Sequence, residues 1–447
     1  MKIVLIGAGK VGYTLAQRLS EDNHDVIVIE QDAERIEVLR KYLEVLVVEG
    51  NGANPDLLES IGMSDTELFV AVTDADEVNL LACYVAKQLG ATQTIARVRA
   101  NEYINGKRTD VLTDLGLTLV INPEMVTAHE ILQILKTPNV LDVESFANGK
   151  ARLIEIKAQD NQSLLNRKIR DLDLPEKILV VGILRHGRMI IPNGDDLILP
   201  LDNIFFLGAS AAIKEMETNL TTQDRTHQLQ NILLVGAGLI GRNLAVLLEN
   251  ENYHVKVIDK DFDRCERLAE MVEKTIVIHG DGTDVDLLRS EEIEDSDVIV
   301  CLTDDDKLNL LVALMAKHFG VAKAFVRVGR PEYIPLMEQV GVDVVFSPRL
   351  VTSTEILRQI RKGDLLTVSS FENSKAEALE LELRIKNPLV GRMLSQVNIP
   401  GSTLLGAVVR GDETIVPNGA TVCQEGDRIV IFTLPEYRDA VLDFMKG

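Results

Sequence analysis

Two glycine-rich segments have the spacing that lets a backbone approach a phosphate group. Gly7, Gly9 and Gly12 directly follow a short apolar run and open a segment whose apolar residues have helical spacing. In such a motif the first glycine permits a tight turn, the second lets the backbone approach a pyrophosphate, and the third lets the helix pack closely on the strand. The N-terminus of that helix attracts phosphates through its free N–H groups and its dipole. The same pattern recurs later in the chain as Gly236, Gly238 and Gly241.

An acidic residue ends the second predicted strand in each copy. Glu30 and Asp259 stand at the same distance beyond their glycine motifs, close to the roughly 20 residues typical of dinucleotide-binding folds. A carboxylate there accepts hydrogen bonds from ribose hydroxyls and repels a 2′-phosphate, which favours NAD, ATP or ADP over NADP. Arg35 and its repeat Arg264 either lie on a solvated helix face or reach a phosphate of the adenosine.

Polar residues also end the third and fourth predicted strands, at the edge where ligands bind in parallel sheets. They are either ligand contacts or simple strand-ending turns. An arginine on the fifth strand pairs either with a phosphate or with a carboxylate inside the fold. These residues are Asn51, Thr73, Asp74 and Arg97 in the first half, and Asp281, Thr303, Asp304 and Arg327 in the second.

Candidate catalytic residues do not recur in this way. Hydride transfer needs a proton donor or acceptor near the nicotinamide. Tyr103 and Tyr333 correspond, but no lysine follows either of them at short helical spacing, which favours a packing role. The 7 histidines do not recur at matching positions. The acidic run 304–306 is either a solvated loop or a cation site, and we assign no catalytic or metal-binding residue.

The elements that must position these residues are repeated as well. In the first half, apolar runs predict strands at 2–6, 25–30, 45–48, 68–72 and 94–98, and apolar spacing predicts helices at 11–19, 32–42, 54–61 and 77–89. This alternation indicates a doubly wound parallel sheet. A second pattern follows, with strands predicted at 151–156, 178–184, 189–191 and 203–207 and a helix at 164–172.

The predicted fold class is therefore α/β, with two doubly wound parallel-sheet Rossmann domains, each followed by a small α+β domain. The first half carries extra residues near 105–110, and the polar segment 217–230 is predicted to link the halves. The predicted domains are 1–138 and 231–362, of the Rossmann type, and 139–218 and 363–447, of the small type.

Composition and charge argue against several classes of protein. The chain has 447 residues, a net charge of −22 at pH 7 and 46% hydrophobic residues, with no Trp. The acidic excess argues against binding to nucleic acid or anionic lipid. No apolar run approaches the roughly 20 residues of a membrane span, and the N-terminus predicts a first strand rather than a signal peptide. The 4 cysteines form no CxxC pair, which indicates buried residues in a reducing cytoplasm.

The order of the four units resembles the TrkA family, the cytoplasmic regulatory subunits of bacterial Trk potassium uptake, which are built from RCK (KTN) N-terminal and C-terminal domains. The resemblance covers essentially the whole chain. It rests on the GAGKVG and GAGLIG motifs, the acids Glu30 and Asp259, the segments ending at Asp74 and Asp304, and the Pro-Asn-Gly turns at 192–194 and 417–419. It implies NAD(H) as ligand, with ATP or ADP as further ligands, and a homotetrameric ring. It also implies a cytoplasmic, peripheral location through a potassium-translocating membrane subunit of the TrkH or TrkG type.

Carried over by position, the resemblance implies two sets of ligand contacts. The pairs Lys10/Leu239, Glu30/Asp259 and Asn51/Asp281 differ between them, so the sites are expected to differ in nucleotide preference. We expect a nucleotide-binding regulatory subunit that gates a membrane partner and is not an enzyme. The alternatives are an NAD-dependent oxidoreductase and a nucleotide-sensing subunit of another channel or transporter. The first set is Gly7, Ala8, Gly9, Lys10, Val11, Glu30, Asn51, Thr73, Asp74 and Arg97, and the second is Gly236, Ala237, Gly238, Leu239, Ile240, Asp259, Asp281, Thr303, Asp304 and Arg327.

Overall fold

The structure is a computed structural model in which the chain forms two compact units. One unit comprises Met1–Gln133 with Leu229–Leu357, and the other comprises Ile134–Gln228 with Arg358–Gly447. Each unit therefore takes one segment from each half of the repeat. Among the described residues, no helix is long and apolar enough to cross a membrane. The described residues are 1–21, 24–100, 103, 115–136, 142–158, 164–223, 229–360, 365–371 and 376–446, so the extra residues expected near 105–110 lie outside them.

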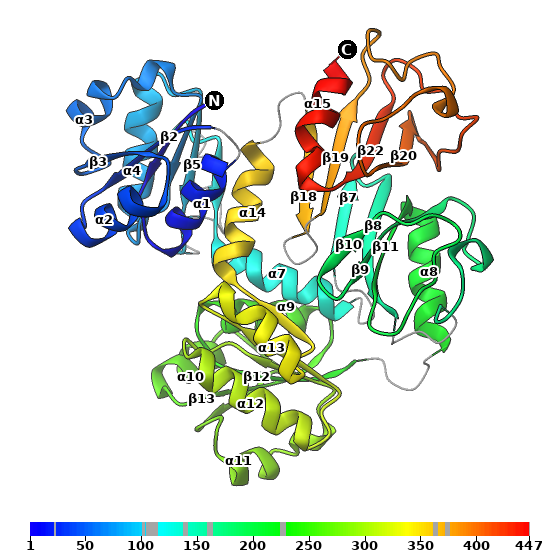
Figure 1. The fold of residues 1–447 in the computed structure, drawn as a ribbon. Coiled ribbons are helices and arrows are strands. Elements are labelled where there is room, and N and C mark those ends of the chain that lie inside the picture. Colours follow the sequence, from blue (N-terminus) through cyan, green and yellow to red (C-terminus); the bar gives the residue numbers. More distant parts are fainter. Residues whose placement is uncertain are drawn as a thin grey trace. The chain divides into compact units, whose positions relative to one another are not determined.

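The first unit contains a parallel sheet from the first half of the chain, with helices packed against it (Figure 1). Its strand order is β3-β2-β1-β4-β5-β6. The order reverses between β1 and β4, which is where such sheets bind ligands, at the carboxyl ends of the strands. The five predicted strands are confirmed, whereas the three-residue β6 was not predicted. The elements are β1 (Lys2–Ile6), α1 (Lys10–Glu21), β2 (Asp25–Glu30), α2 (Ala33–Tyr42), β3 (Leu46–Glu49), α3 (Pro55–Ser60), β4 (Leu68–Ala71), α4 (Asp76–Gln88), β5 (Gln93–Arg97), β6 (Leu119–Ile121) and α7 (Pro123–Lys136).

The second half repeats this sheet within the same unit, in the order β14-β13-β12-β15-β16-β17. The two central strands are buried apart from Asn231, because helices cover both faces of the sheet, which explains their continuous apolar sequences. The predicted pair of doubly wound sheets is confirmed. The elements are β12 (Asn231–Val235), α9 (Leu239–Asn250), β13 (His254–Asp259), α10 (Phe262–Ala269), β14 (Ile276–His279), α11 (Val285–Ser290), β15 (Val298–Cys301), α12 (Asp306–His318), β16 (Lys323–Arg327), α13 (Ile334–Val340), β17 (Val344–Phe346) and α14 (Pro348–Ile360).

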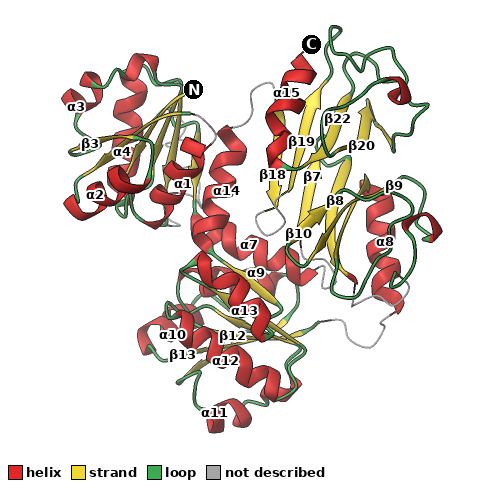
Figure 2. Ribbon diagram, in the orientation of Figure 1, coloured by secondary structure: helices red, strands yellow, loops and turns green. Residues whose placement is uncertain are grey.

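The second unit contains two antiparallel sheets, one from each half (Figure 2), with the orders β10-β9-β11-β8-β7 and β18-β19-β22-β20-β21. The predicted small α+β domains are thus confirmed as a fold class. The first sheet has β7 (Asp142–Phe146), β8 (Ala151–Lys157), β9 (Ile178–Arg185), β10 (Arg188–Ile190) and β11 (Asn203–Ala209), followed by α8 (Ser210–Gln223). The second has β18 (Leu365–Phe371), β19 (Ala376–Glu382), β20 (Thr403–Arg410), β21 (Glu413–Ile415) and β22 (Arg428–Thr433), followed by α15 (Arg438–Lys446).

One hydrophobic core joins the two antiparallel sheets. Phe205 of β11 and Phe432 of β22 contact each other with ring centroids 5.8 Å apart, and both belong to a cluster with residues from each sheet. Lys150 donates from Nζ to the carbonyl oxygen of Gly411 at 2.8 Å and to Asp412 Oδ1 at 2.7 Å. Because the core is shared, the two small domains stabilise each other.

The helix predicted at 164–172 is wrong. Only the short 3-10 helix Ile169–Asp171 forms there. Asn166 has a φ of 57°, in the left-handed region. The backbone N–H groups of Asn166 and Ile169 donate to the carbonyl oxygens of Ile198 and Asp196 instead of within a helix. Pairing with a distant turn therefore overrides local helical spacing.

The predicted linker at 217–230 is also partly wrong, because α8 continues to Gln223. Polar composition favoured a loop, but threonine and glutamine tolerate a helix when the preceding turn packs on a core. Ile213 and Met216 supply that packing, since both are buried in the first small domain.

Glu249, near the end of α9, anchors the segment that leads into β14. Its carboxylate accepts hydrogen bonds from the backbone N–H groups of Glu273, Lys274 and Thr275 at 2.8–3.0 Å, and from Thr275 Oγ1 at 2.7 Å. Partial burial alone would raise the pKa of Glu249, but these bonds outweigh it and lower the pKa from 4.5 to about 2. At the matching position of the first half, Ser20 Oγ donates a hydrogen bond to the carbonyl oxygen of Glu44 at 2.9 Å.

We expect Glu249→Gln to lower the free energy of unfolding by about 1–2 kcal/mol at pH 7, since a neutral amide accepts fewer and weaker bonds. The native pKa lies below the unfolded value, so the contribution is complete above pH 4.5 and is lost as the pH falls toward 2. Urea unfolding of both proteins should therefore show a difference at pH 7 that shrinks near pH 3. Ser20→Ala is the matched control, and its smaller loss of unfolding free energy should not change with pH. An equal loss for Glu249→Gln at both pH values would show that the charge of Glu249 does not stabilise the fold.

Candidate nucleotide sites

The first and third glycines of each motif are required by packing inside the protein. Gly7 and Gly236 have φ values of 89° and 116°, a region that residues with a side chain rarely adopt. A β-carbon on Gly12 would stand 1.9 Å from the carbonyl oxygen of Gly7, and one on Gly241 would stand 2.0 Å from that of Gly236. These four glycines therefore make the turn and let the helix approach the strand.

The second glycine of each motif is not required by this packing. Apart from its chain neighbours, a β-carbon on Gly9 would meet only Arg35 Nη1, at 3.7 Å, among the described atoms within 4 Å. A β-carbon on Gly238 would meet no described atom at all. Gly238 is also the N-cap of α9, and no described side chain caps that helix. Each motif thus presents open space beside its backbone at the start of a helix, which is where phosphates bind.

The remaining motif residues divide into exposed and buried side chains. Lys10 and Leu239 are the first residues of α1 and α9, and both are exposed. Val11 and Ile240 point into the core, as do the alanines between the first two glycines. Only the backbone of the buried residues can therefore face a ligand.

The strand-end acids hold the glycine turns in place. Glu30 Oε2 accepts a hydrogen bond from Ala8 N at 2.5 Å, and Asp259 Oδ2 accepts one from Ala237 N at 2.6 Å. Both acids are buried, with 8% and 7% of their surface exposed. Each carboxylate therefore lies directly beside the glycine turn of its own half.

Arg35 and Arg264 lie beside these acids. Arg35 Nη1 is 3.8 Å from Glu30 Oε2, and Arg264 Nη1 is 3.9 Å from Asp259 Oδ2. Both side chains remain more than two-fifths exposed. Both arginines therefore lie on a solvated helix face, and contact with a phosphate of the adenosine stays a prediction.

Asn51 and Asp281 follow the third strands and form turns with their own chain. Asn51 Oδ1 accepts from Ala53 N at 2.9 Å, and Asp281 Oδ1 accepts from Thr283 N at 2.9 Å and from Thr283 Oγ1 at 2.7 Å. The bonds from Thr283 lower the pKa of Asp281. Both side chains thus have a structural role in the absence of a ligand.

Thr73 and Thr303 are fixed by a residue whose role sequence reasoning missed. Asn79, buried in α4, accepts from Thr73 N at 2.9 Å and Thr73 Oγ1 at 2.7 Å, and donates to the carbonyl oxygens of Thr73 and Arg97. Asn309 makes the same four bonds in the second copy. The recurrence of this asparagine was visible in the sequence, but its role in joining the ends of two strands required the geometry.

The arginines of the fifth strands pair with carboxylates here. Arg97 Nη1 is 3.5 Å from Asp74 Oδ1, and Nη2 is 3.9 Å from Glu124 Oε1. Arg327 Nη1 is 2.9 Å from Asp304 Oδ1. Within the described residues, the buried Nε atom of each arginine has no hydrogen-bond partner. Burial raises the pKa of Glu124, against the opposing charge of Arg97.

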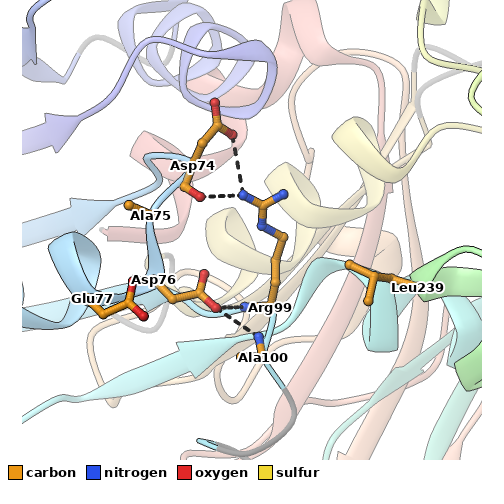
Figure 3. A pocket seen from close by; sticks show the side chains of 7 residues that line it. All are labelled: Asp74, Ala75, Asp76, Glu77, Arg99, Ala100 and Leu239. Carbon is orange, nitrogen blue, oxygen red and sulfur yellow. Dashed lines mark hydrogen bonds and ion pairs between the residues drawn. The ribbon is translucent and has the colours of Figure 1, made fainter. Parts of the chain in front are cut away.

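Beside the first site lies an open pocket of about 530 Å³, in which Asp74 and Leu239 were predicted site residues and the other lining residues were not. Figure 3 shows Asp76 Oδ2 accepting from the backbone N–H groups of Arg99 and Ala100, at 2.9 and 2.8 Å. The guanidinium of Arg99 contacts both the backbone carbonyl oxygen and the carboxylate of Asp74. Leu239 of the second glycine motif completes the lining, so the first unit brings residues of both sequence halves to one pocket.

The corresponding place in the second copy has a different source of positive charge. Gly329 stands where the first copy has Arg99, and its N–H donates to Asp306 Oδ1 at 2.7 Å. A β-carbon on Gly329 would stand 3.5 Å from Asp306 Oδ1 and 3.8 Å from Lys10 Nζ. Lys10 therefore approaches this strand end from the other sequence half, and the two sites are chemically unequal.

The recurring tyrosines make different contacts in the two halves. Tyr103 Oη is 3.4 Å from Glu77 Oε1, and Tyr333 packs against the core of the second parallel sheet below Arg330. In the part of the chain that the structure describes, no cluster of three or more His, Cys, Asp or Glu side chains could hold a metal ion.

Comparison with protein families gives matches in both halves. The TrkA-N domain model matches residues 3–123 and 232–348. The TrkA-C domain model matches residues 153–221 and 379–446. The internal repeat is therefore a repeat of a TrkA-N and TrkA-C pair.

Full-length relatives agree with this pattern. The chain is 39% identical to Trk system potassium uptake protein TrkA homolog 1 of Methanosarcina mazei, over 100% of both chains. It is 34% identical to Trk system potassium uptake protein TrkA of Halomonas elongata, over 98% of this chain and 97% of that one. Among solved structures, the "GsuK channel bound to NAD" matches with a TM-score of 0.65 at 17% identity, covering 100% of this chain and 79% of that one, which shows a shared fold. The chain therefore belongs to the TrkA family of Trk system potassium uptake proteins.

Proposed function

We propose that this chain is a regulatory subunit that binds adenine nucleotides at two sites and controls a potassium-translocating membrane subunit of the TrkH or TrkG type. The observation that carries the proposal is the open space at Gly9 and Gly238, two glycines that internal packing does not require. Each lies at the start of a helix and beside a buried carboxylate, so phosphates and a ribose have adjacent partners.

The proposed contacts are the two sets predicted from the sequence, with Arg99 added to the first. The ligands proposed are NAD(H), ATP and ADP, because Glu30 and Asp259 would repel a 2′-phosphate. Structures described as GsuK bound to NAD and bound to ADP support this choice through the shared fold. The names of the relatives support the potassium uptake system.

Regulation requires that the ligand bind one state of the subunit better than another. We propose that the two nucleotide folds change their contacts on binding and that a homotetrameric ring transmits the change to the membrane partner. The chain would thus lie on the cytoplasmic face of the membrane through that partner. In this role the bound nucleotide is a signal and is not consumed.

The test is calorimetric titration of the purified protein with NADH, NAD, NADPH, ATP and ADP, followed by a turnover assay. We expect NADH or adenine nucleotides to bind at both glycine motifs without being converted. Binding confined to NADPH, or no binding, would show that the strand-end acids do not recognise a ribose. Oxidation of hydroxy acids with NAD as hydride acceptor, or reduction of aldehydes with NADH as hydride donor, would instead support an oxidoreductase.

A further inference from the structure

We propose that Phe262 and His279 form an aromatic platform for the adenine base at the second nucleotide site. The inference rests on the proposed nucleotide binding and adds the group that recognises the base. It assigns base stacking to the second site and not to the first.

The two rings lie next to the acid assigned to the ribose. Phe262 is the first residue of α10 and is 61% exposed. Its ring contacts the His279 ring edge-on, with centroids 5.5 Å apart and an interplanar angle of 84°. His279 ends β14 and is the register partner of Asp259 on β13. Since neighbouring strands lie about 5 Å apart, a base attached to a ribose at Asp259 is within reach of this ring pair.

Hydrogen bonds hold the platform in position before any ligand binds. His279 Nε2 lies 3.1 Å from the carbonyl oxygen of Lys260. A carbonyl oxygen can only accept, so Nε2 carries the hydrogen and donates it. The thiol of Cys265 in α10 lies 3.4 Å from the carbonyl oxygen of Asp259 and 3.7 Å from that of Ile278, which ties the helix to both strand ends. A preformed contact surface lowers the entropy cost of binding.

The exposed ring of Phe262 provides an apolar surface on which a flat base can stack. Burial of the apolar surface of an exposed phenyl ring is favourable, and bases stack favourably on aromatic rings. At the equivalent positions of the first copy stand Ala33 and Glu49, both exposed, so no ring is available there. The repeat therefore differs in how each site would hold the base.

A tryptophan reporter tests the stacking directly, because the chain has no Trp of its own. In Phe262→Trp, we expect ADP to quench the fluorescence in a saturable way and inorganic pyrophosphate to leave it unchanged. Tyr42→Trp is the matched control, since Tyr42 is 62% exposed at the far end of α2, and its fluorescence should not respond to ADP.

Calorimetry of Phe262→Ala gives the second measurement. We expect about tenfold weaker ADP binding at one of the two sites, with unchanged affinity for pyrophosphate. Unchanged ADP binding in Phe262→Ala, or an equal loss of affinity for ADP and pyrophosphate, would overturn the proposed platform. The proposed function would still stand in that case if the parent protein binds ADP. If the parent itself binds no nucleotide, both proposals fail.

Discussion

Alanine at Gly9 or Gly238 is expected to weaken nucleotide binding at the altered site about 100-fold while the chain stays folded. The added methyl group would enter open space in both places, so the protein itself has room for it. It would keep the phosphates from the backbone N–H groups of the turn. Each hydrogen bond to a charged group is worth about 1.5–3 kcal/mol, and losing two of them at the lower end of this range gives about this factor.

Titration calorimetry with ADP measures the affinity, and the melting temperature reports folding. Because Gly→Ala restricts the unfolded chain, the melting temperature of Gly9→Ala and Gly238→Ala should stay level or rise slightly. The contrast is Gly12→Ala, whose β-carbon would stand 1.9 Å from a carbonyl oxygen, so this variant should melt at a lower temperature. If Gly9→Ala and Gly238→Ala bind ADP as the parent does, the glycine turns do not hold phosphate.

Patterns that depend on local periodicity could be predicted from the sequence. The buried strands of both parallel sheets have continuous apolar sequences, and the glycine motifs mark where each first strand passes into its helix. Glu30 and Asp259 could be placed because the acid ends a strand of fixed position in the fold. The internal repeat supported each of these predictions twice.

Features that depend on distant backbone pairing could not be predicted. The segment 164–172 has apolar residues at helical spacing, yet its N–H groups pair with the turn near Asp196. Arg99 and Gly329 occupy equivalent positions, but only Arg99 has a positively charged side chain. The folded chain alone shows that Lys10 lies near Gly329. The role of Asn79 depends on the ends of two strands meeting, which composition does not indicate. The site residues themselves stay predictions until a ligand is measured.

Arg410→Ala is expected to lower the free energy of unfolding of the unit that contains the two small domains by about 2–4 kcal/mol. Arg410 binds Asp427 through two hydrogen bonds, from Nε at 2.9 Å and from Nη2 at 2.8 Å. The Asp427 side chain is only 2% exposed, so removing the arginine leaves a buried carboxylate without its counter-ion. The hydrogen bonds to Asp427 raise the pKa of Arg410, against the effect of burial. The expected loss is below that of a fully buried pair because the Arg410 side chain is 34% exposed.

A double variant separates the cost of an unpaired charge from the net value of the pair. Arg410→Met combined with Asp427→Leu removes both charges, so urea unfolding should show most of the lost stability restored. Arg185 and Asp202 form the same pair in the first small domain, at 2.8 Å for both bonds, and Arg185→Ala should cost a similar amount. The two small domains share one core, so each substitution should shift a single unfolding transition. A loss for Arg410→Ala below about 0.5 kcal/mol would mean that water replaces the guanidinium and that Asp427 is held by its backbone bond from Gln424 alone.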